Sequence, residues 1–580
     1  MLQQQMDAFV SARSAELAEQ ATIRAVLNSY LRETRETDPR TENGPRDSGG
    51  SPFLLTLPFT GRAIAGEMTY YSKIGQHAYG ASFSEILPDG RRRELRVSSL
   101  IDLLLEELVG LTSPDQPEAC VRLMKARIEN SCRKMSMHIE HYLSQLPTLA
   151  EKKLDLVRSE QSLYFGHPFH PYPKSSDGFA DDELAKFSPE MGAAFRLHYF
   201  AVKKDLVTEE WLDGPEAVLP LEAHSEAKRR MEDREGGFTI VPMHPWQADY
   251  VMALPEVQAR MERGEIISLG LLGPNVYPTS SVRTVWDPAG GYGFKLPLHV
   301  RITNLLRENN SEQTRRTMDA ARVLRHLQGQ LGADSFQILS ETGYSSVRFA
   351  SPNECPPCFT VIYRPMAVDN ETTFVMASLL ESYPGGAEPK LIQAIRQSNR
   401  GRLPDLSAWL ERYLQISMLP MLRLLAHRGI SFEAHLQNSL LSIRQGWPAI
   451  YYVRDLEGVS IDRKLAERAG WIGTLLAQDS PVLYDEAEAW MRTKYYFFVN
   501  HLGSLVHTLS ASQKEDEEHG WRIVRELLQQ EKTVARGRLR AYIEELLEGD
   551  HLPAKANFIS CFLKRGETPL FVDIPNPIKG

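Results

Sequence analysis

The sequence predicts an α+β fold of several domains, and three observations support this prediction. A chain of 580 residues is too long for one hydrophobic core, and at about 100–200 residues per domain it favours three or four domains. Hydrophobic residues make up 42% and charged residues 24%, values typical of a soluble globular protein. Helical patterns dominate both ends of the chain, whereas short β-type runs separated by turns fill the middle. This order predicts an antiparallel sheet region with helical mass after it.

Composition and charge exclude disordered chains, collagen-like chains and disulfide-stabilised miniproteins. The formal net charge is −9, from 75 acidic and 66 basic residues, whereas nucleic-acid binding usually leaves a basic footprint, so we expect no nucleic acid partner. The five cysteines are too few for a disulfide framework, and their odd number favours a reducing compartment. Cys355-Pro-Pro-Cys358 has no second pair to complete a zinc site, so ordinary thiols in a loop are expected there.

We expect neither a membrane span nor a secretion signal. No segment reaches the roughly 18 consecutive apolar residues that a bilayer requires. The chain begins Met-Leu-Gln-Gln-Gln-Met-Asp, which has no cationic head and no apolar signal region. We therefore expect a cytoplasmic protein with no membrane partner.

Residues 1–165 are expected to form a first domain from helices and a small sheet. Apolar side chains recur at helical spacing within residues 3–36. Short β-favouring runs between Phe53 and Val97 surround a Pro88-Asp89-Gly90 turn, which predicts an antiparallel unit. A helical pattern then returns from Leu100 to about Leu163.

Residues 166–360 are expected to form a β-rich second domain. It opens on Gly166 to Pro173, where prolines recur every two or three residues and prevent a helix. Helical stretches are expected near residues 245–263 and 311–331. Residues 361–580 are expected to form a mostly helical third domain.

The segment from Thr279 to Arg307 has the most informative pattern of the chain. Two β-type runs, Ser280–Trp286 and Phe294–Asn304, flank a glycine-rich turn and predict a hairpin. Because side chains alternate between the faces of a strand, one face collects Lys295, His299, Arg301 and Thr303, joined by Ser281 and Arg283 of the first run. This face fits anion binding. The solvated face of an edge hairpin is an equal alternative, although the lack of Asp and Glu argues against it.

A β-like pair around Leu436–Ile443 and Ala449–Val453 interrupts the helical third domain. Asn438 lies in its first segment, and Asp455 follows the second segment shortly before a glycine. Carboxylate and amide oxygens suit a hard cation, and protein kinases hold magnesium with the same two residue types. From the pattern alone, a turn in which Asp455 caps backbone amides is the stronger alternative.

Six motifs of the sequence occur in a recognisable order. They are Gly166-His-Pro-Phe-His170-Pro-x-x-Lys174, His244-Pro-Trp-Gln247, Ser280-Ser281-x-Arg283-Thr284, Lys295 with His-Val-Arg-Ile-Thr303-Asn304-x-x-Arg307, Glu433-x-His435-x-Gln437-Asn438 and Arg454-Asp455-x-x-Gly458. Together they resemble the motifs of the NRPS-independent siderophore synthetases, the aerobactin synthetase-like family. The similarity runs over nearly the whole chain, and six motifs in order are far more specific than any one of them.

The resemblance implies a three-part "cupped hand" fold. Residues 1–165 would form a thumb, residues 166–360 the fingers and residues 361–580 the palm, with ATP and a carboxylate between fingers and palm. It also implies a homodimer and a two-step reaction. A substrate carboxylate attacks the α-phosphate of Mg-ATP and releases pyrophosphate, and a nucleophile then attacks the acyl-adenylate.

The resemblance also implies roles for residues at the matching motif positions. Four catalytic residues would be Lys295, Thr303, Arg307 and His435. Nucleotide-binding residues would be His170, Ser281, Arg283, Thr284, Lys295, Gln437, Asn438 and Asp455, with Asp455 and Asn438 as Mg²⁺ ligands. The sequence departs from the family at Ser176, where many relatives carry an arginine two residues after the lysine of this motif, so one carboxylate-binding cation is absent.

The expected function is therefore an ATP-dependent ligase that activates citrate and joins it to a polyamine or diamine. A citryl or succinyl monoamide is an alternative carboxylate substrate within the same family. A phosphotransferase that releases ADP is an alternative from another class of enzyme. A ferric citrate-binding protein is weaker, because citrate alone needs no magnesium site.

Overall fold

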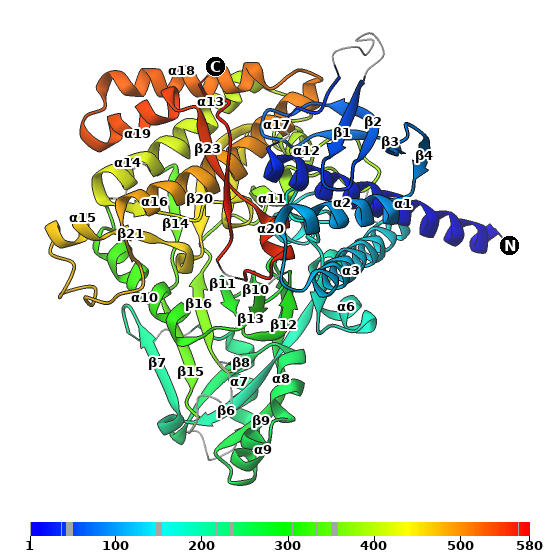
Figure 1. Ribbon diagram of the computed structural model, residues 1–580. Coiled ribbons are helices and arrows are strands. Elements are labelled where there is room, and N and C mark those ends of the chain that lie inside the picture. Colours follow the sequence, from blue (N-terminus) through cyan, green and yellow to red (C-terminus); the bar gives the residue numbers. More distant parts are fainter. Residues whose placement is uncertain are drawn as a thin grey trace.

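The structure is a computed structural model that describes residues 2–35, 38–41, 50–146, 153–214, 218–231, 236–303, 305–330, 334–349, 358–566 and 568–579. Figure 1 shows a helical and sheet-containing N-terminal part, a β-rich part at the bottom and a helical mass opposite to it. This mixed architecture confirms the predicted α+β class. Cys355 and Asn304 of the sequence patterns lie outside the described residues.

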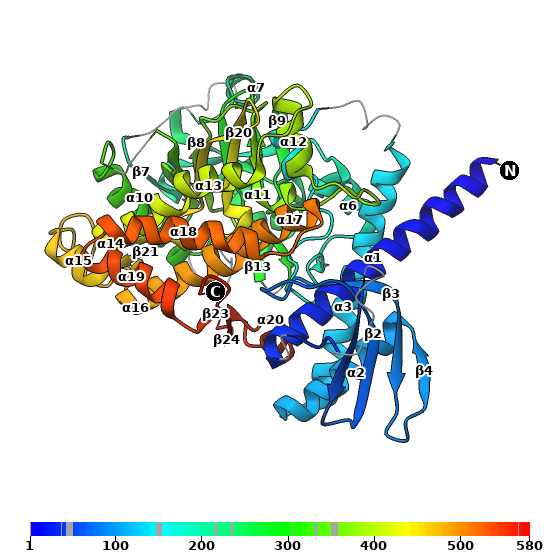
Figure 2. The same cartoon turned by 90° about the horizontal axis from the view of Figure 1, so that it is seen from above.

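The N-terminal part packs a four-stranded antiparallel sheet against three long helices. Its elements are α1 (Leu2–Thr34), β1 (Ser51–Leu57), β2 (Arg62–Tyr70), β3 (Ala78–Ile86), β4 (Arg92–Leu95), α2 (Val97–Thr112) and α3 (Pro117–Ser144). The predicted helices and the turn at Asp89 and Gly90 between β3 and β4 are confirmed. Figure 2 shows this part projecting sideways from the rest of the molecule.

The central part is built on an eight-stranded antiparallel sheet. In spatial order its strands are β7 (Val207–Trp211), β15 (Gly343–Val347), β16 (Val361–Pro365), β11 (Tyr292–Lys295), β10 (Thr284–Asp287), β9 (Ile266–Pro278), β6 (Phe195–Lys203) and β8 (Phe238–Met243). Nearby helical segments are α5 (Leu156–Glu160), α6 (Asp181–Phe187), η1 (Pro189–Met191), η2 (Lys204–Leu206), α7 (Leu221–Met231), α8 (Pro245–Met252), α9 (Pro255–Glu262) and α10 (Ser311–His326). The helices expected near residues 245–263 and 311–331 are thereby confirmed.

The predicted hairpin exists, but its two strands are shorter than the sequence pattern indicates. β10 and β11 pair with Thr284 opposite Lys295. The second strand ends there because Pro297 has no N–H to donate to a neighbouring strand. The chain continues into a different, three-stranded sheet of β13 (Leu305–Arg307), β12 (Leu298–Ile302) and β5 (Ser176–Asp177). Ser281 and Arg283 therefore lie in a loop before β10 rather than on the predicted strand.

The C-terminal part is mostly helical, as predicted. Its helical segments are α11 (Met376–Leu379), α12 (Lys390–Ser398), α13 (Leu406–Ile416), α14 (Met418–Arg428), η4 (Leu436–Asn438), η5 (Leu456–Gly458), α15 (Arg463–Arg468), α16 (Glu486–Thr493), η6 (Lys494–Leu502), α17 (Gly503–Gln513), α18 (Glu518–Val534), α19 (Gly537–Glu548) and α20 (Asn557–Phe562). Its strands are β14 (Phe336–Leu339), β17 (Thr373–Val375), β18 (Ile430–Ser431), β19 (Ser439–Arg444), β20 (Trp447–Arg454), β21 (Ser460–Asp462), β22 (Leu483–Tyr484), β23 (His551–Lys555) and β24 (Phe571–Pro575).

The predicted β pair of this part is the hairpin β19–β20. Gln445 and Gly446 at its tip both have positive φ, 51° and 82°, which matches the twist of a two-residue hairpin turn. β14 adds to β20 in parallel and β17 adds to β19, so the hairpin lies in the middle of a four-stranded sheet. The end of β20 is therefore fixed within the protein, and Asp455 follows it directly.

The C-terminal residues return to the N-terminal core. Phe558 and Phe562 of α20 are buried in the same hydrophobic cluster as residues of α1 and β1. The carboxylate of Glu33 accepts the N–H groups of Phe558 and Ile559, both at 2.7 Å, and so satisfies the first turn of α20. Segments from opposite ends of the chain thus share one core, and the expected boundaries near residues 165 and 360 stay predictions.

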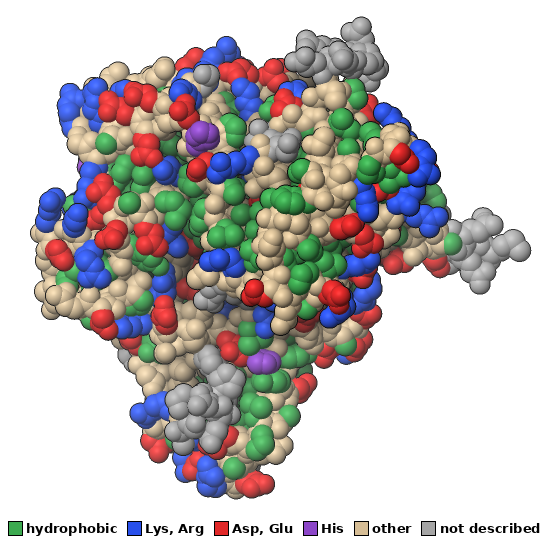
Figure 3. Space-filling view, in the orientation of Figure 1, with side chains coloured by type: hydrophobic (Ala, Val, Ile, Leu, Met, Phe, Trp, Pro, Cys, Tyr) green, Lys and Arg blue, Asp and Glu red, His purple; other side chains and the backbone are tan. Residues whose placement is uncertain are grey.

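The described part of the chain contains no helix with the length and apolar character to span a membrane. On the face shown in Figure 3, Lys and Arg side chains are interspersed with Asp and Glu.

Several histidines of the described residues have a pKa below the usual 6.5, because burial disfavours the charged imidazolium. The pKa is lowered to about 3 in His77, His170, His244 and His501, and to about 4 in His138.

We expect the free energy of unfolding to fall as the pH drops below about 6.5. A pKa depressed by folding contributes stability above the unfolded pKa, and this stability is lost as the pH falls toward the folded pKa. Each such histidine adds a slope of about 1.4 kcal/mol per pH unit within that window. Urea unfolding between about pH 7.5 and 5 measures the slope. An unfolding midpoint that stays constant over this range would contradict the buried neutral histidines.

Candidate active site

A cavity of about 1360 Å³ lies where the three parts of the chain meet. Residues of α1 and β3 line it on one side, loops around β10 to β13 on another, and residues of η4, α17 and the end of β20 on a third. All eleven residues that the resemblance implied are among its lining residues, namely His170, Ser281, Arg283, Thr284, Lys295, Thr303, Arg307, His435, Gln437, Asn438 and Asp455. The structure thus brings them together, and their individual roles stay predictions.

Three non-glycine residues at the cavity have positive φ. They are Val282 at 67°, Thr303 at 56° and Asp455 at 73°. This conformation costs energy, most of all for side chains branched at the β-carbon, so neighbouring contacts must stabilise it. The N–H of Val282 donates to the carbonyl of Thr279, and the N–H of Thr303 donates to the carbonyl of Ser175, both at 2.8 Å. Strained backbone of this kind clusters at functional sites.

Lys295 joins the central sheet to the C-terminal part. Its side chain is only 4% exposed, and its Nζ donates to Asp455 Oδ1 at 2.7 Å and to Glu457 Oε2 at 2.8 Å. The interpretation of this strand face as solvated is therefore wrong for Lys295. The turn-capping alternative for Asp455 is also wrong, because its side chain makes no capping hydrogen bond to η5.

Lys295, Asp455 and Glu457 keep one another ionised. Burial alone would raise the pKa of the Asp455 carboxyl, but the charges of Lys295, Arg364 and Arg283 outweigh it and hold the pKa well below its usual range. The same balance between burial and Lys295 lowers the pKa of Glu457. Burial would lower the pKa of Lys295, and the two carboxylates reverse that effect and raise it.

His299 was expected on the same strand face as Lys295, but it does not belong to this charge cluster. Its Nδ1 lies 2.5 Å from Glu308 Oε1, and its ring stacks on Tyr250 at 4.5 Å. It is not among the residues that line the described cavity. The interpretation of the whole face as an anion-binding surface is therefore wrong for His299, because β12 belongs to a different sheet from β11.

Glu160 positions the loop that carries Ser281 and Arg283. Its Oε2 accepts the N–H of Ser280 at 3.0 Å and the hydroxyl at 2.8 Å, while its Oε1 accepts from Arg454 at 2.5 Å. Arg454 also donates to the carbonyl of Gln437 at 2.8 Å. One buried carboxylate thus connects a loop of the central part with the end of β20.

Glu341 positions the turn after β20 in a similar way. Its Oε1 accepts from Nε of Arg364 at 3.0 Å, and its Oε2 accepts the N–H of Leu456 at 3.2 Å. Since Leu456 follows Asp455 directly, this pair fixes the direction of the Asp455 side chain.

The Arg283 guanidinium is held by neutral oxygens. Its Nη1 donates to the carbonyl of Glu308 at 2.8 Å and to Asn309 Oδ1 at 2.9 Å, and its Nη2 lies 3.7 Å from Glu457 Oε2. In the same loop the hydroxyl of Ser281 accepts the N–H of Thr284 at 3.2 Å. Arg283 is therefore held in place at the cavity wall, and Glu457 neutralises part of its positive charge.

Arg307 has no carboxylate partner among the described residues. Its Nη2 donates to the carbonyl of Ile302 at 3.2 Å, and its buried Nε has no hydrogen-bond partner. Burial, reinforced by Arg283, lowers the pKa of Arg307 to about 10 against the opposing charges of Glu457 and Asp455. The guanidinium stays charged at neutral pH and lines the cavity, so it is an open site for an anion.

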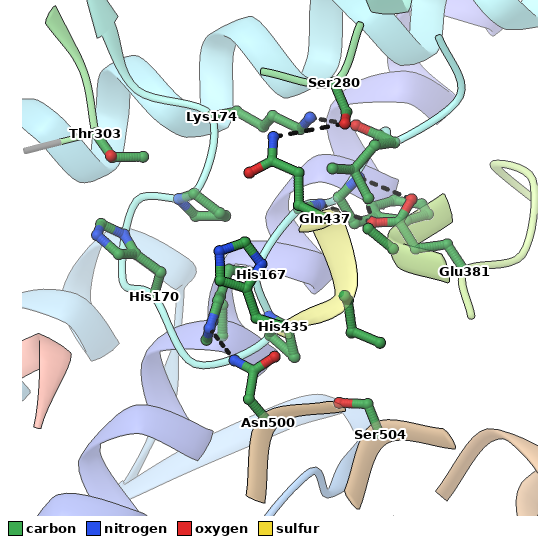
Figure 4. Close-up of a pocket in the computed structure, with 18 of the residues that line it drawn as sticks. His167, His170, Lys174, Ser280, Thr303, Glu381, His435, Gln437, Asn500 and Ser504 are labelled. Atoms are coloured by element: carbon green, nitrogen blue, oxygen red, sulfur yellow. Dashed lines mark hydrogen bonds between the residues drawn. The ribbon is translucent and has the colours of Figure 1, made fainter. Parts of the chain in front are cut away.

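Figure 4 shows Thr303, His435, Gln437 and Ser280 around the same space. The amide of Gln437 donates to the Ser280 hydroxyl at 3.5 Å, and Asn438 donates to the Glu433 carbonyl at 3.2 Å. Burial lowers the pKa of His435; the charge of Lys555 adds to this effect and that of Glu433 opposes it, so the imidazole favours the neutral form.

The proline-rich segment after residue 165 also lines the cavity. His167 Nε2 lies 2.7 Å from the Asn500 amide, whereas His170 Nδ1 accepts the N–H of Tyr172 at 3.3 Å (Figure 4). Lys174 of this segment pairs with the buried Glu190 at 2.5 Å. That lysine charge is neutralised within the protein, so it adds little to the anion-binding character of the cavity.

Sequence patterns did not reveal several charged groups of the site. Glu457 shares Lys295 with Asp455, and Glu341 and Glu160 orient the arginines beside them. Glu457 lies only two residues after Asp455, so its position in the quoted Arg-Asp motif was a usable signal. Glu160 and Glu341 precede turns far away in the chain, and no local pattern marks them.

Asp455 and Glu457 fit the requirements of a Mg²⁺ site for a nucleotide. The described residues contain no group of three or more His, Cys, Asp or Glu side chains that could hold a metal ion by themselves. Magnesium in such sites is usually held by one or two carboxylates together with substrate phosphates and water. The two carboxylates, both in contact with Lys295 Nζ, supply that number of ligands.

Comparison with known proteins shows which families and enzymes the chain resembles. The model of the IucA / IucC family matches residues 155–381, and a model described as ferric iron reductase FhuF-like transporter matches residues 407–570. An L-2,3-diaminopropanoate–citrate ligase of Staphylococcus aureus is 33% identical, with 96% of each chain covered. A spermidine–citrate ligase of Bacillus anthracis is 26% identical, with 97% of this chain and 98% of that protein covered.

A solved structure has the same fold. The ATP-bound aerobactin synthetase IucA from a hypervirulent pathotype of Klebsiella pneumoniae superimposes with a TM-score of 0.84 over 96% of this chain and 99% of that chain, at 23% identity. Since the 33% identical relative matches nearly end to end, the chain belongs to the IucA/IucC family of NRPS-independent siderophore synthetases.

Proposed function

We propose that this synthetase uses Mg-ATP to adenylate a carboxylate of citrate and then joins the acyl group to an amine. The printed names of the two full-length relatives support citrate as the carboxylate substrate. They support a diamine or polyamine as nucleophile, since one relative is named for diaminopropanoate and the other for spermidine.

The supporting observation is the arrangement of charge at one end of the cavity. Lys295 is held by two ionised carboxylates, and the nearby Arg307 has no carboxylate partner among the described residues. A nucleotide and citrate are both polyanions that repel each other, so a site that joins them needs several fixed cations. Arg283 and Arg307 provide such cations, and Mg²⁺ on Asp455 and Glu457 would offset the two carboxylates that neutralise Lys295.

The chemistry requires positioning and charge neutralisation rather than a covalent enzyme intermediate. A citrate oxygen attacks the α-phosphorus of ATP, an O–P bond forms, and pyrophosphate leaves with the electrons of the broken bond. The amine nitrogen then attacks the acyl carbon, a C–N bond forms, AMP leaves, and the nitrogen loses a proton. Mg²⁺ held by Asp455, with Asn438 and Glu457 beside it, would neutralise phosphate charge.

The residues around citrate would have separate tasks. Arg307 would bind the reacting carboxylate or the α-phosphate through its planar guanidinium. Thr303 and His435 would contact the substrate, and the neutral form of His435 would do so as a hydrogen-bond acceptor. Ser281, Thr284 and Gln437 would contact phosphates.

The nucleotide product tests this proposal directly. With citrate, Mg-ATP and a panel of amines we expect AMP and pyrophosphate in equal amounts, detected by chromatography and a pyrophosphate-release assay. ADP as the product would instead indicate a phosphotransferase. Turnover with a citryl monoamide, but with no amine when citrate is supplied, would show that the carboxylate substrate is assigned wrongly.

We also propose a cytoplasmic homodimer. The reaction consumes ATP, and five cysteines in 580 residues are too few for a disulfide framework, which fits a reducing compartment. The dimer rests on the family resemblance, and analytical ultracentrifugation measures it.

A further inference from the structure

Arg24 is an unusual residue of the cavity wall, because it is an exposed charge within a buried helix. Every residue of α1 from Ala21 to Glu33 is buried except Arg24. Arg24 lines the cavity together with Gln20 of the same helix. Its guanidinium is therefore accessible from the cavity, while the rest of this part of the helix packs into the protein.

The charge of Arg24 is not neutralised by a close partner. Neither a hydrogen bond nor an ion pair joins its side chain to another residue in the described part of the chain. The protein around the cavity lowers the pKa of Arg24 by desolvation, and the more distant charges of Glu381 and Tyr79 only partly oppose that effect. The side chain is nevertheless exposed to the cavity, so its charge is available to an anionic ligand.

Glu381 also lines the cavity (Figure 4), and its charge acts on Arg24, but its carboxylate already has other partners. Its carboxylate accepts the N–H groups of Tyr164 at 2.9 Å and Gly166 at 2.7 Å, and Lys390 Nζ lies 3.9 Å away. These groups neutralise Glu381 locally. A carboxylate that forms an ion pair with the Arg24 guanidinium would therefore come from a ligand.

Arg24 belongs to a different wall of the cavity from the proposed adenylation residues. It comes from α1, whereas Lys295, Arg307 and Asp455 come from the central sheet region and the end of β20. A cation on α1 can be used by the second substrate of the reaction, which enters after the acyl-adenylate has formed. A polyamine has only positive charges, and an unpaired guanidinium would repel it.

We propose that Arg24 binds the carboxylate of the nucleophile, and that the nucleophile is a diamino acid rather than a simple polyamine. This inference rests on the proposed ligase function and specifies its second substrate. Arg24 orients the amino acid through a charge-assisted, bidentate contact while the amine reacts with the acyl-adenylate.

Matched pairs of amines test the inference, because each diamine lacks only the carboxylate of its partner. The pairs are 2,3-diaminopropanoate with ethylenediamine and ornithine with putrescine. We expect wild-type protein to prefer a diamino acid over its partner. Arg24→Gln should raise KM for that acid about 10- to 100-fold, the effect of losing one charge-assisted contact, and leave the diamine unchanged. Arg24→Lys should recover part of the loss.

Two controls separate this inference from the proposed function. Citrate-dependent trapping of the adenylate by hydroxylamine reports the first step alone, and Arg24→Gln should leave it unchanged. Arg122→Gln removes an equal charge from α3, where Arg122 lies 3.6 Å from Glu118 and is not among the residues that line the described cavity, and should behave as wild type.

Several outcomes would overturn the assignment of Arg24. One is an equal rise in KM for the diamino acid and its diamine in Arg24→Gln. Another is wild-type protein that prefers the diamine or spermidine. The third is a loss of hydroxamate formation in Arg24→Gln. If wild-type protein forms no hydroxamate with citrate, the proposed function itself fails. Calorimetric titration with 2,3-diaminopropanoate still decides the role of Arg24, since equal binding by wild type and Arg24→Gln would refute it without any turnover.

Discussion

Arg307→Ala should lower kcat/KM for citrate-dependent adenylation by roughly 10²–10³-fold, the usual effect of removing one preorganised charge from an active site. Arg307 is half-buried at the wall of the cavity that Lys295 and Arg283 also line, and it has no carboxylate partner among the described residues. Among the described residues its side chain donates to the carbonyl of Ile302, and no carboxylate of the protein neutralises its charge. Pyrophosphate release with saturating Mg-ATP and varied citrate measures the effect.

The same substitution should not destabilise the protein. Removing a partly desolvated charge also removes its desolvation cost, so we expect the Tm of Arg307→Ala to equal or exceed that of wild type. Arg307→Lys should recover only part of the activity, because a point charge lacks the planar fork of a guanidinium. Arg263→Ala is the charge-matched control, since Arg263 pairs with Glu265 on the exposed surface. A Tm drop that accounts for the lost activity would assign Arg307 a structural role instead.

Local sequence patterns predicted those elements whose stability is itself local. The long helix α1 and the hairpin β19–β20 follow from apolar periodicity and from a glycine in a two-residue turn. The hairpin β10–β11 was also predicted from local patterns, but its second strand was predicted too long. The period of two continues through Pro297, and only the missing N–H of that proline separates β11 from β12.

The eleven implied site residues came together in one cavity, and the family resemblance rather than periodicity pointed to them. The ion pairs around them could not be predicted, because each joins segments far apart in the chain. Lys295 and Asp455 are 160 residues apart, and Arg454 and Glu160 are 294 apart. Arg24 gave no signal at all, since its exposure depends on how α1 packs against the remaining protein.

Asp455→Asn should weaken Mg²⁺ binding first and catalysis only as a consequence. The substitution preserves shape, and asparagine tolerates the positive φ of 73° at this position, so the turn should persist. It removes one of two ionised carboxylates that contact Lys295 Nζ. Loss of a carboxylate ligand should weaken the apparent affinity for Mg²⁺ by at least about 10- to 100-fold, which is the range for disturbing a metal's supporting groups.

Activity measured at constant Mg-ATP and rising free Mg²⁺ should therefore recover in Asp455→Asn, whereas Arg307→Ala should not recover. Glu457→Gln is the matched comparison, because Glu457 meets the same lysine nitrogen at 2.8 Å and should show the same magnesium dependence if both carboxylates hold the ion. If Asp455→Asn loses the same fraction of wild-type activity at all magnesium concentrations, Asp455 serves only to hold Lys295. In that case Lys295→Met combined with Asp455→Asn should lose no more activity than Lys295→Met alone, because the two side chains would act as one unit.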